Sequence, residues 1–505
     1  MGDTYNPYSD LTHFDNVVVT GNPYILRDDI FSPEEMQRIQ KELNLWKFYK
    51  GNQWKVQRPT GEPQITLNYC RAFVDKGVAF LMSKGFSFKV KPEAEEITKP
   101  LLNTIWEDNN KELLGVEMAQ AGGITGNAWV KVVVENYDPK LQPEYYDMYP
   151  NGRIRILILP TYTVFPTWDA HDRDRMVRCM IIYPVILEQE NADGSISKEQ
   201  VWYREEITSQ EITEYINDTQ INKRENILRE IPVVRIKNLP LPGEPYGMSD
   251  LQDIIPLQVE INNKTTDISD IINYHAAPVT IVQGAKVKDL ERGARKVWSG
   301  IPKDGKVYNL ELETDLAAAN NYLGFLKTAM FEIAHMPKDA FGHGEGRISN
   351  TSGIALHIKN QPLMELTRTK WITYGEGIRK INRLILKYAE LIKHPDFDLE
   401  GFKKLKSPQK YWTEVIFPNP LPKDELMQLQ LMAQKISLLL QSRKDALIEL
   451  GETEAAEKLA EIIEEARYIQ DSVYDADLQL ERARDLNLGG IISKDEKARD
   501  DISDD

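Results

Sequence analysis

Two N-terminal segments carry the signals of helices. Residues 32–50 begin with Ser32, Pro33 and Glu35, which predict an N-cap, a first-turn proline and a capping box. Between residues 69 and 83 the apolar side chains recur at roughly helical spacing, at Phe73, Val74, Val78, Phe80 and Leu81. We therefore expect two helices near the start of the chain.

The pattern changes from helical to alternating between residues 127 and 240. The stretches WVKVVVE, RIRILILP and RMVRCMIIYPVI are rich in β-branched residues, and turn-forming segments such as PEYYDMYPNGR and ENADGS interrupt them. This block is expected to form a mostly antiparallel sheet that packs on the preceding helices.

Helical spacing returns after the loop-like segment LPLPGEPYG. Ser249 and Gln252 have the spacing of a capping box. Pro256 is expected to kink or restart the helix, and Pro278 to end it, because proline lacks the amide that the helical ladder needs. The sequence thus predicts a helix of about 30 Å over roughly 20 residues.

A second helix of matching length is predicted over residues 315–336. It stops before Pro337, since the residue that precedes a proline disfavours helical backbone angles. The segment between the two helices, residues 281–312, shows no sustained period. Two matched helices are therefore expected to bracket a small insert.

The C-terminal third begins with a loop and continues as helices. Residues 341–353, FGHGEGRISNTSG, are rich in glycine, and a long helix is predicted over residues 353–393 with an interruption at Pro362. Its apolar stripe comprises Ile378, Ile381, Leu384, Ile385, Tyr388, Leu391 and Ile392. Residues 424–485 are typical of further acidic helices, and the tail 493–505 is typical of disorder.

Composition limits the class of protein. The chain has 505 residues, of which 41% are hydrophobic and 28% charged, enough for roughly three domains with real cores. Its formal net charge of −16 argues against a protein that coats nucleic acid through bulk positive charge. Residues 421–505 alone carry a formal charge of −10, and such an acidic segment is typical of a solvated, self-repelling surface.

Cys70 and Cys179 are the only cysteines, which excludes a disulfide framework and a Cys-rich zinc site. A reducing compartment is expected.

The first residues, MGDTYNPYSD, lack the basic-then-apolar pattern of a secretory signal, and no apolar run approaches the 18 residues or so that span a bilayer. The protein is expected in the cytoplasm of the cell that makes it, without membrane partners.

Motifs for catalysis, metals and cofactors are missing. Gly342, Gly344 and Gly346 do not have P-loop or dinucleotide-fold spacing, and no Gly-x-Ser-x-Gly elbow occurs. The seven histidines show no metal-ligand spacing, and His275 and His335 lie near predicted helix ends. We expect no catalytic residue, metal or cofactor, although carboxylate counting alone leaves a two-metal nuclease site open.

One local charge feature stands out between residues 284 and 310. Three acidic and seven basic residues give this insert a charge of +4 in an acidic protein, and the basic ones are Lys286, Lys288, Arg292, Arg295, Lys296, Lys303 and Lys306. The insert is either an ordinary solvated tip or a surface for an acidic partner such as nucleic acid or a protein.

The order of these segments resembles the SPP1-like portal proteins of tailed double-stranded-DNA phages. The resemblance rests on LWKFYKGNQW and ITLNYCRAFVDKGVAFLMSKGFSFKV, on AGGITGNAWVKVVV, on the stretch from IPVVRIKNLP through GMSDLQDIIP to APVTIVQG, and on MPKDAFGHGEGRISNTSGIALH. It covers about residues 40–440. Pro256 within a stem helix and the longer, more polar glycine loop depart from the family pattern.

The resemblance implies an α+β, predominantly helical fold that assembles into a ring. Its parts would be a wing with an antiparallel sheet, a two-helix stem, a small α/β clip and a helical crown. The implied divisions are wing 1–248 and 339–424, stem helices 249–276 and 315–338, clip 277–314, and crown with acidic tail 425–505.

In function, the resemblance implies a head-to-tail connector at one vertex of the phage capsid, made in the host cytoplasm. A ring of twelve subunits would let double-stranded DNA enter and leave, and would contact terminase, a head-completion or tail-connector protein, and capsid and scaffolding proteins. A tunnel with net negative walls would bind phosphates weakly. The alternatives are a packaging motor ATPase or nuclease, and a ring or adaptor scaffold without DNA.

The resemblance also assigns two sets of site residues. The seven basic residues of the +4 insert would bind partners at the clip. The loop after the second stem helix, residues 341–350, would project into the tunnel, with site residues Phe341, Gly342, His343, Gly344, Glu345, Gly346 and Arg347. His343 and Arg347 would contact phosphates, and Glu345 would keep those contacts weak.

Overall fold

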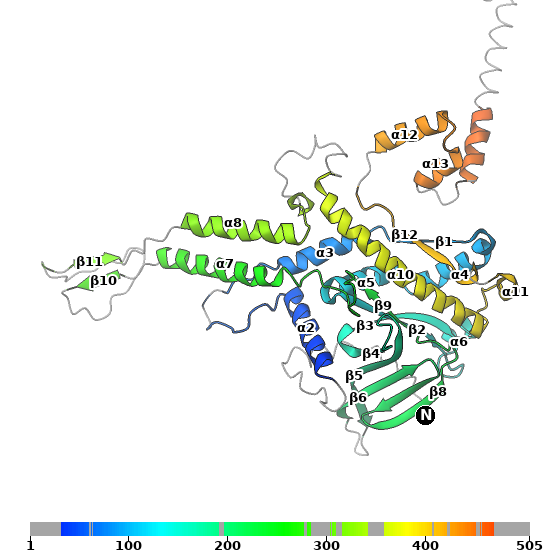
Figure 1. The fold of residues 1–505 in the computed structure, drawn as a ribbon, viewed down its shortest axis with the longest axis horizontal. Coiled ribbons are helices and arrows are strands. Elements are labelled where there is room, and N and C mark those ends of the chain that lie inside the picture. Colours follow the sequence, from blue (N-terminus) through cyan, green and yellow to red (C-terminus); the bar gives the residue numbers. More distant parts are fainter. Residues whose placement is uncertain are drawn as a thin grey trace, which may run out of the picture. The chain divides into compact units, whose positions relative to one another are not determined.

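The computed structural model describes residues 32–59, 62, 64–190, 196–276, 280–283, 304, 306–309, 316–341, 358–406, 409–421, 425–450, 455 and 457–468. The chain divides into two compact units, Met1–Leu421 and Pro422–Asp505. Figure 1 shows the described elements in the colours of the sequence. The predicted α+β class is confirmed, because helices and antiparallel sheets both occur in the first unit.

Both predicted N-terminal helices are confirmed. Helix α2 spans Pro33–Lys50, and the Ser32 hydroxyl accepts a hydrogen bond from the Glu35 amide. The helix ends at Gly51, whose φ of 88° lies in the left-handed region that glycine tolerates. Helix α3 spans Tyr69–Met82 and is capped by the side chain of Asn68.

The alternating block forms two antiparallel sheets rather than one. The first has the order β3-β2-β9, and its strands are β2 (Asn127–Glu135), β3 (Arg153–Leu159) and β9 (Val233–Lys237). The second has the order β4-β5-β6-β7-β8, and its strands are β4 (Val164–Trp168), β5 (Met176–Glu190), β6 (Ile196–Thr208), β7 (Glu211–Ile216) and β8 (Thr219–Glu225). The antiparallel prediction is therefore confirmed, and its single sheet is wrong.

Helix α10, Gln361–Ile392, packs on the three-stranded sheet (Figure 1). Its buried stripe shares a core with α4 (Glu95–Asp108), α5 (Lys111–Thr125) and the sheet. The Trp106 indole of α4 donates to Asn382 Oδ1 of α10 over 2.7 Å. The packing on preceding helices is confirmed, because α3, α4 and α5 all contribute to this core.

The predicted interruption at Pro362 is also confirmed. Residues 358 and 359 are helical, Asn360 leaves helical geometry, and Pro362 occupies the first turn of α10. Residues 353–357 of the predicted helix lie outside the described residues.

The two matched helices are α7, Ile255–Ala276, and α8, Leu316–Ile333. They lie side by side (Figure 1), and β10 (Thr280–Gln283) pairs with β11 (Lys306–Asn309) between them in the chain. The predicted pair of helices around a small insert is confirmed. That they form a stem and a clip stays a prediction.

The predicted cap of α7 is wrong. The Ser249 hydroxyl donates to the carbonyl oxygen of Ile124 over 2.5 Å and accepts from the Leu251 amide, so it fastens a turn before the helix. The helix begins at Ile255, with Pro256 in its first turn, where the missing amide costs no hydrogen bond. Of the two alternatives for Pro256, the restart is the correct one.

Shorter elements complete the first unit. Strand β1 (Ser87–Val90) pairs with β12 (Thr413–Ile416). The others are η2 (Pro92–Ala94), α6 (Pro143–Met148), η3 (Thr161–Thr163), η4 (Lys338–Phe341), α11 (Leu399–Lys404) and η6 (Gln409–Tyr411).

The second unit is helical, as predicted for its described part. Helix α12 spans Glu425–Ser437, α13 spans Arg443–Leu450, and residues 457–468 are helical. Among the residues of this unit whose exposure the structure describes (429–450, 455 and 457–468), Met432, Ala446 and Ala455 are buried, whereas Leu438, Leu439 and Leu440 are exposed. The predicted disordered tail lies outside the described residues.

Candidate functional site

The paired helices α7 and α8 differ in charge. Residues 316–326 of α8 include no charged side chain, and Tyr322 and Phe325 are exposed there. Helix α7 carries charged side chains such as Lys264, which pairs with Asp267 at 3.2 Å. One helix of the pair therefore presents a long neutral surface.

The chain just before α7 is bound to the rest of the unit by a buried ion pair. Lys370 Nζ of α10 lies 2.5 Å from Asp250 Oδ2, and their side chains are only 5% and 15% exposed. Asp250 Oδ1 accepts from the Asn238 side-chain amide over 2.8 Å, and the Asp250 main-chain amide donates to the Gly123 carbonyl. The start of α7 is thus joined to α10, to the end of β9 and to α5.

Two glycines allow a close backbone crossing at the same place. Gly126 has a φ of 89°, and a Cβ atom there would lie 2.4 Å from the Gly247 carbonyl oxygen. A Cβ atom on Gly247 would lie 2.5 Å from the Gly126 carbonyl oxygen. Any side chain at either position would separate the end of α5 from the chain that leads to α7.

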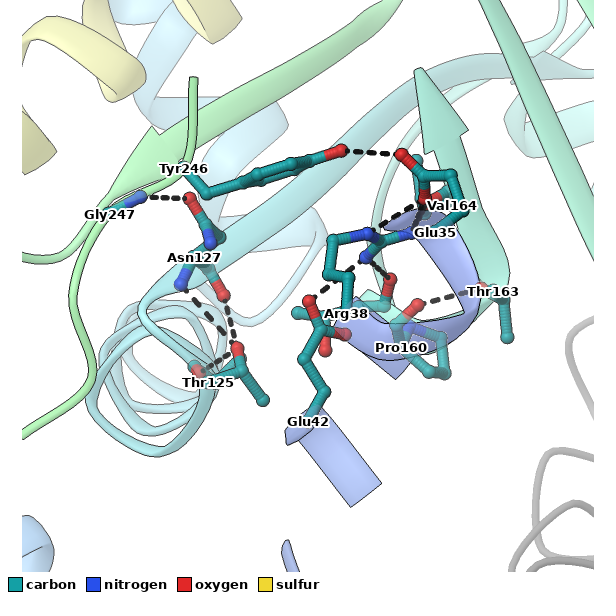
Figure 2. A network of polar contacts seen from close by, with 12 residues as sticks. Glu35, Arg38, Glu42, Thr125, Asn127, Pro160, Thr163, Val164, Tyr246 and Gly247 are labelled. Carbon is teal, nitrogen blue, oxygen red and sulfur yellow. Dashed lines mark hydrogen bonds and ion pairs between the residues drawn. The ribbon is translucent and has the colours of Figure 1, made fainter. Parts of the chain in front are cut away.

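The ion pair of Lys370 with Asp250 is the first of two anchors of the chain that leads to α7. The second is the network around Arg38 of α2, which Figure 2 shows. One Nη donates to Glu42 Oε1 (2.9 Å) and to the Thr161 carbonyl oxygen, and the other donates to Glu35 Oε2 (2.7 Å) and to the Val164 carbonyl oxygen. Burial alone would lower the pKa of Arg38, but the neighbouring carboxylates outweigh it and raise the pKa. Burial raises the pKa of Glu42. The guanidinium therefore stays charged and ties α2 to β4 and η3.

Tyr246 connects this anchor to the chain before α7. Its hydroxyl donates to Glu35 Oε1 over 3.1 Å, and its ring centroid lies 5.2 Å from the Arg38 guanidinium carbon. The next residue, Gly247, donates its amide to Asn127 Oδ1 at the start of β2 (Figure 2). The two anchors together fix the approach to α7.

Of the predicted tunnel-loop residues, Phe341 is described. It ends η4 and packs edge-to-face on Phe73 and Phe331, with ring centroids 5.7 Å and 5.6 Å away. Gly342, His343, Gly344, Glu345, Gly346 and Arg347 lie outside the described residues. Phe341 is therefore a packed anchor at one end of the predicted loop.

Of the seven basic residues predicted at the clip, Lys306 is described. It is exposed at the start of β11, and its main chain lies opposite that of Gln283 of β10 in the antiparallel strand pair. Lys286, Lys288, Arg292, Arg295, Lys296 and Lys303 lie outside the described residues.

The described residues also bear on chemistry and membranes. In this part of the chain, no group of three or more His, Cys, Asp or Glu side chains could hold a metal ion. No described helix is long and apolar enough to cross a bilayer.

Burial raises the pKa of the Cys70 thiol, and likewise that of Cys179, to about 12. Both thiols therefore remain protonated near neutral pH.

Sequence analysis named Glu35 only as part of a capping box and missed the ion pairs around Arg38 and between Lys370 and Asp250. The spacing of Glu35, Arg38 and Glu42 places the three side chains on one helix face, which was a usable signal for an ion-pair network. Lys370 and Asp250 are 120 positions apart. Nothing local indicates that pair.

Comparison with known protein families identifies one match. The family model described as "Phage portal protein, SPP1 Gp6-like" matches residues 29–472, which is most of the chain. A search of curated proteins found no match.

Proposed function

The chain belongs to the SPP1-like family of phage portal proteins, and on that premise we propose which of its parts perform the work of a portal. The protein is a structural head-to-tail connector: it forms an oligomeric ring at a capsid vertex, and double-stranded DNA passes through it during packaging and ejection. Capsid protein, terminase and DNA are its general partners. We propose a ring of twelve subunits without enzymatic activity.

In this proposal α7 and α8 form the stem, and the segment 277–314 forms the clip. The observation that carries the assignment is the pair of adjacent helices. The antiparallel strands β10 and β11 lie between them in the chain, and the buried ion pair of Asp250 with Lys370 holds the segment before α7. The wing would then comprise residues 1–248 and 339–424, and the crown residues 425–505. A rigid root suits a stem because it transmits force to the wing without bending.

Charge supports the role as a DNA channel. A wall that binds phosphates tightly would hold the DNA, because cations that neutralise phosphates supply most of the affinity. Residues 316–326 offer no cation, and the chain has a net charge of −16. DNA can therefore slide past such subunits.

The clip would dock partner proteins through its basic residues. The +4 charge of residues 284–310 in an acidic chain supports an acidic partner surface. We propose terminase during packaging and a head-completion or tail-connector protein afterwards as the occupants. Scaffolding protein would contact the ring during capsid assembly.

Residues 341–350 would form the tunnel loop. Phe341 packs against Phe73 and Phe331 at the first end of the loop, which supports a fixed point there, and α10 farther along the chain is buried along the sheet. Three glycines at alternate positions give its backbone freedom. His343 and Arg347 would contact phosphates transiently, since exposed contacts are screened by salt.

The test replaces residues 342–347 with a short rigid linker. Electron microscopy should show rings of unchanged symmetry, whereas heads built on these rings should retain less DNA. A linker of six Gly and Ser residues is the control, because it keeps the flexibility and removes only the charges. Normal DNA content in heads with the rigid linker would overturn the tunnel-loop assignment.

A further inference from the structure

Helix α7 has a buried stripe of uncharged polar side chains. Gln258, Asn262 and Thr266 follow one another at intervals of four, so they lie on one face of the helix. Their exposed fractions are 0%, 2% and 0%. Buried amides and hydroxyls destabilise a fold unless they form hydrogen bonds, so this stripe must have polar partners.

The partner of each is the main chain of the segment before α3. The Ile65 amide donates to Thr266 Oγ1 over 3.1 Å and the Leu67 amide donates to Asn262 Oδ1 over 3.0 Å. The Tyr69 amide donates to Gln258 Oε1 over 3.1 Å. Gln258 also donates to the Leu67 carbonyl oxygen over 2.6 Å.

Geometry explains why this ladder keeps its register. Four residues of a helix rise about 6 Å, and two residues of extended chain advance about 6.6 Å. Every fourth side chain of α7 can therefore meet every second amide of an extended segment for three rungs. The helix takes the place that a neighbouring strand would have in a sheet.

We call residues 51–68 the strap; the structure describes residues 51–59, 62 and 64–68 of it. The outgoing part of the strap also contacts the stripe, because the Asn262 amide donates to Gln53 Oε1 over 2.6 Å. The two parts are joined to each other by the Trp54 indole, which donates to Thr66 Oγ1 over 2.8 Å.

The tip of the strap is held differently. Arg58 forms an ion pair with Asp270, one turn beyond Thr266, at 2.7 Å, and the two side chains are 30% and 43% exposed. Val56 is 77% exposed. Because exposed ion pairs are weak and screened by salt, this contact between the tip and α7 is weaker than the buried rungs of the ladder.

We propose that the strap is a brace that fixes α7 against the wing, and that Gln258, Asn262 and Thr266 are its positioning residues. It opens from the Arg58 tip toward the Gln258 end. The strap follows α2, which Arg38 anchors, and continues into α3, so both of its ends are joined to packed helices of the wing while its middle contacts one face of α7. Its consequence for DNA packaging rests on the proposed stem role of α7.

Hydrogen exchange, resolved to single amides by mass spectrometry on the full-length protein, tests the brace. The variant Asn262→Leu keeps the volume and removes the acceptor of the Leu67 amide and the donor to Gln53, and Asn263→Leu is the matched control on the partly exposed neighbour. In Asn262→Leu the Leu67 amide should exchange about tenfold faster, the effect of losing one buried hydrogen bond. Equal exchange in both variants would overturn the brace.

Two further arms keep the test decisive. Thr266→Val removes only the acceptor for the Ile65 amide, and Thr265→Val removes only a bond within α7, so this pair serves if Asn262→Leu fails to fold. Higher salt should speed exchange near Arg58 and leave Leu67 protected; equal acceleration at both would overturn opening from the tip.

A DNA-packaging assay with variant rings distinguishes the brace hypothesis from the stem assignment. Rings of Asn262→Leu should keep their symmetry and package less DNA than rings of Asn263→Leu. Faster exchange with normal packaging would contradict the positioning role while leaving the ladder in place. Unchanged exchange would contradict the ladder whatever the packaging result, so failure of the brace and failure of the stem role are distinguishable.

Discussion

Helices α7 and α10 both bury one face, but against different kinds of partner. The buried face of α10 is largely apolar, with Ile378, Ile381 and Ile385 at 0% exposure, and packs on side chains of α4, α5 and the three-stranded sheet. The buried stripe of α7 is polar and binds main-chain amides of the strap. Apolar packing is non-directional and gains with area, whereas each rung of the ladder needs one atom in one place.

The two kinds of buried face differ in how well they tolerate substitution. An apolar face can repack around a substitution of similar volume, because contacts are many and individually small. A ladder cannot, because a lost acceptor leaves a buried amide without a partner. We expect α10 to determine the stability of the wing and α7 to determine the position of the stem.

The largest effect is expected for Ile381→Ala in α10. The side chain is fully buried, so its truncation leaves a cavity and should lower the free energy of unfolding by about 4 kcal/mol. Ile372→Ala is the control on the same helix, because Ile372 is 75% exposed and should change little. Urea unfolding followed by tryptophan fluorescence measures both. Equal losses would contradict an apolar face as the source of stability.

A smaller effect is expected for Lys370→Met, where α10 meets the start of α7. The change leaves Asp250 buried with the Asn238 amide but without its cation, and should cost about 3 kcal/mol. The double variant with Asp250→Asn removes the charge as well and should recover most of the loss. The same urea titration measures both variants. A double variant as unstable as the single one would show that charge balance is not what holds the segment before α7 to α10.

The smallest effect concerns the end of α10 and its dependence on pH. Burial raises the pKa of Glu390, but hydrogen bonds from Lys410 Nζ (2.7 Å) and the Tyr411 hydroxyl (2.8 Å) outweigh it and hold the pKa below its ordinary value. A lowered pKa stabilises the fold above the unfolded-state pKa, and this contribution is lost as pH falls through the folded-state pKa.

Glu390→Gln should therefore lower the melting temperature at pH 7, and the difference from the unchanged protein should shrink as the pH falls from about 5 toward 3. The matched comparison is Asn262→Leu, whose effect should not depend on pH because the three side chains of the ladder do not titrate. Thermal melts across this range measure both. A difference for Glu390→Gln that stays constant with pH would contradict the assigned cause.

The amino-acid sequence was sufficient for elements whose signals are local. The capped start at Ser32, the alternation from residue 127 onward and the apolar stripe of α10 all predicted the observed elements. It was insufficient at Ser249, whose capping spacing is real but whose hydroxyl binds the end of α5. A side chain with two available partners is decided by what the fold brings near it.

Family membership was also within reach of the sequence, because the order of short motifs along some 400 residues carries it. The candidate site could be predicted from the sequence only in part. The paired helices were predicted, but the ion pair of Lys370 with Asp250 and the ladder on α7 were not. Gln258, Asn262 and Thr266 have helical spacing, yet a polar stripe at that spacing ordinarily faces water. Only the folded chain shows that it faces Ile65 and Leu67.

Local amino-acid patterns specify which segments form helices and strands, because the spacing of apolar residues, caps and prolines acts over a few positions. Which segments come into contact is set by the folded chain as a whole: β1 pairs with β12, Lys370 with Asp250, and the strap with α7. Hydrogen bonds and ion pairs form between any donor and acceptor that come within reach, so residue type alone does not select the partner. The selection comes from the packed core, which brings positions 120 to more than 300 residues apart into contact.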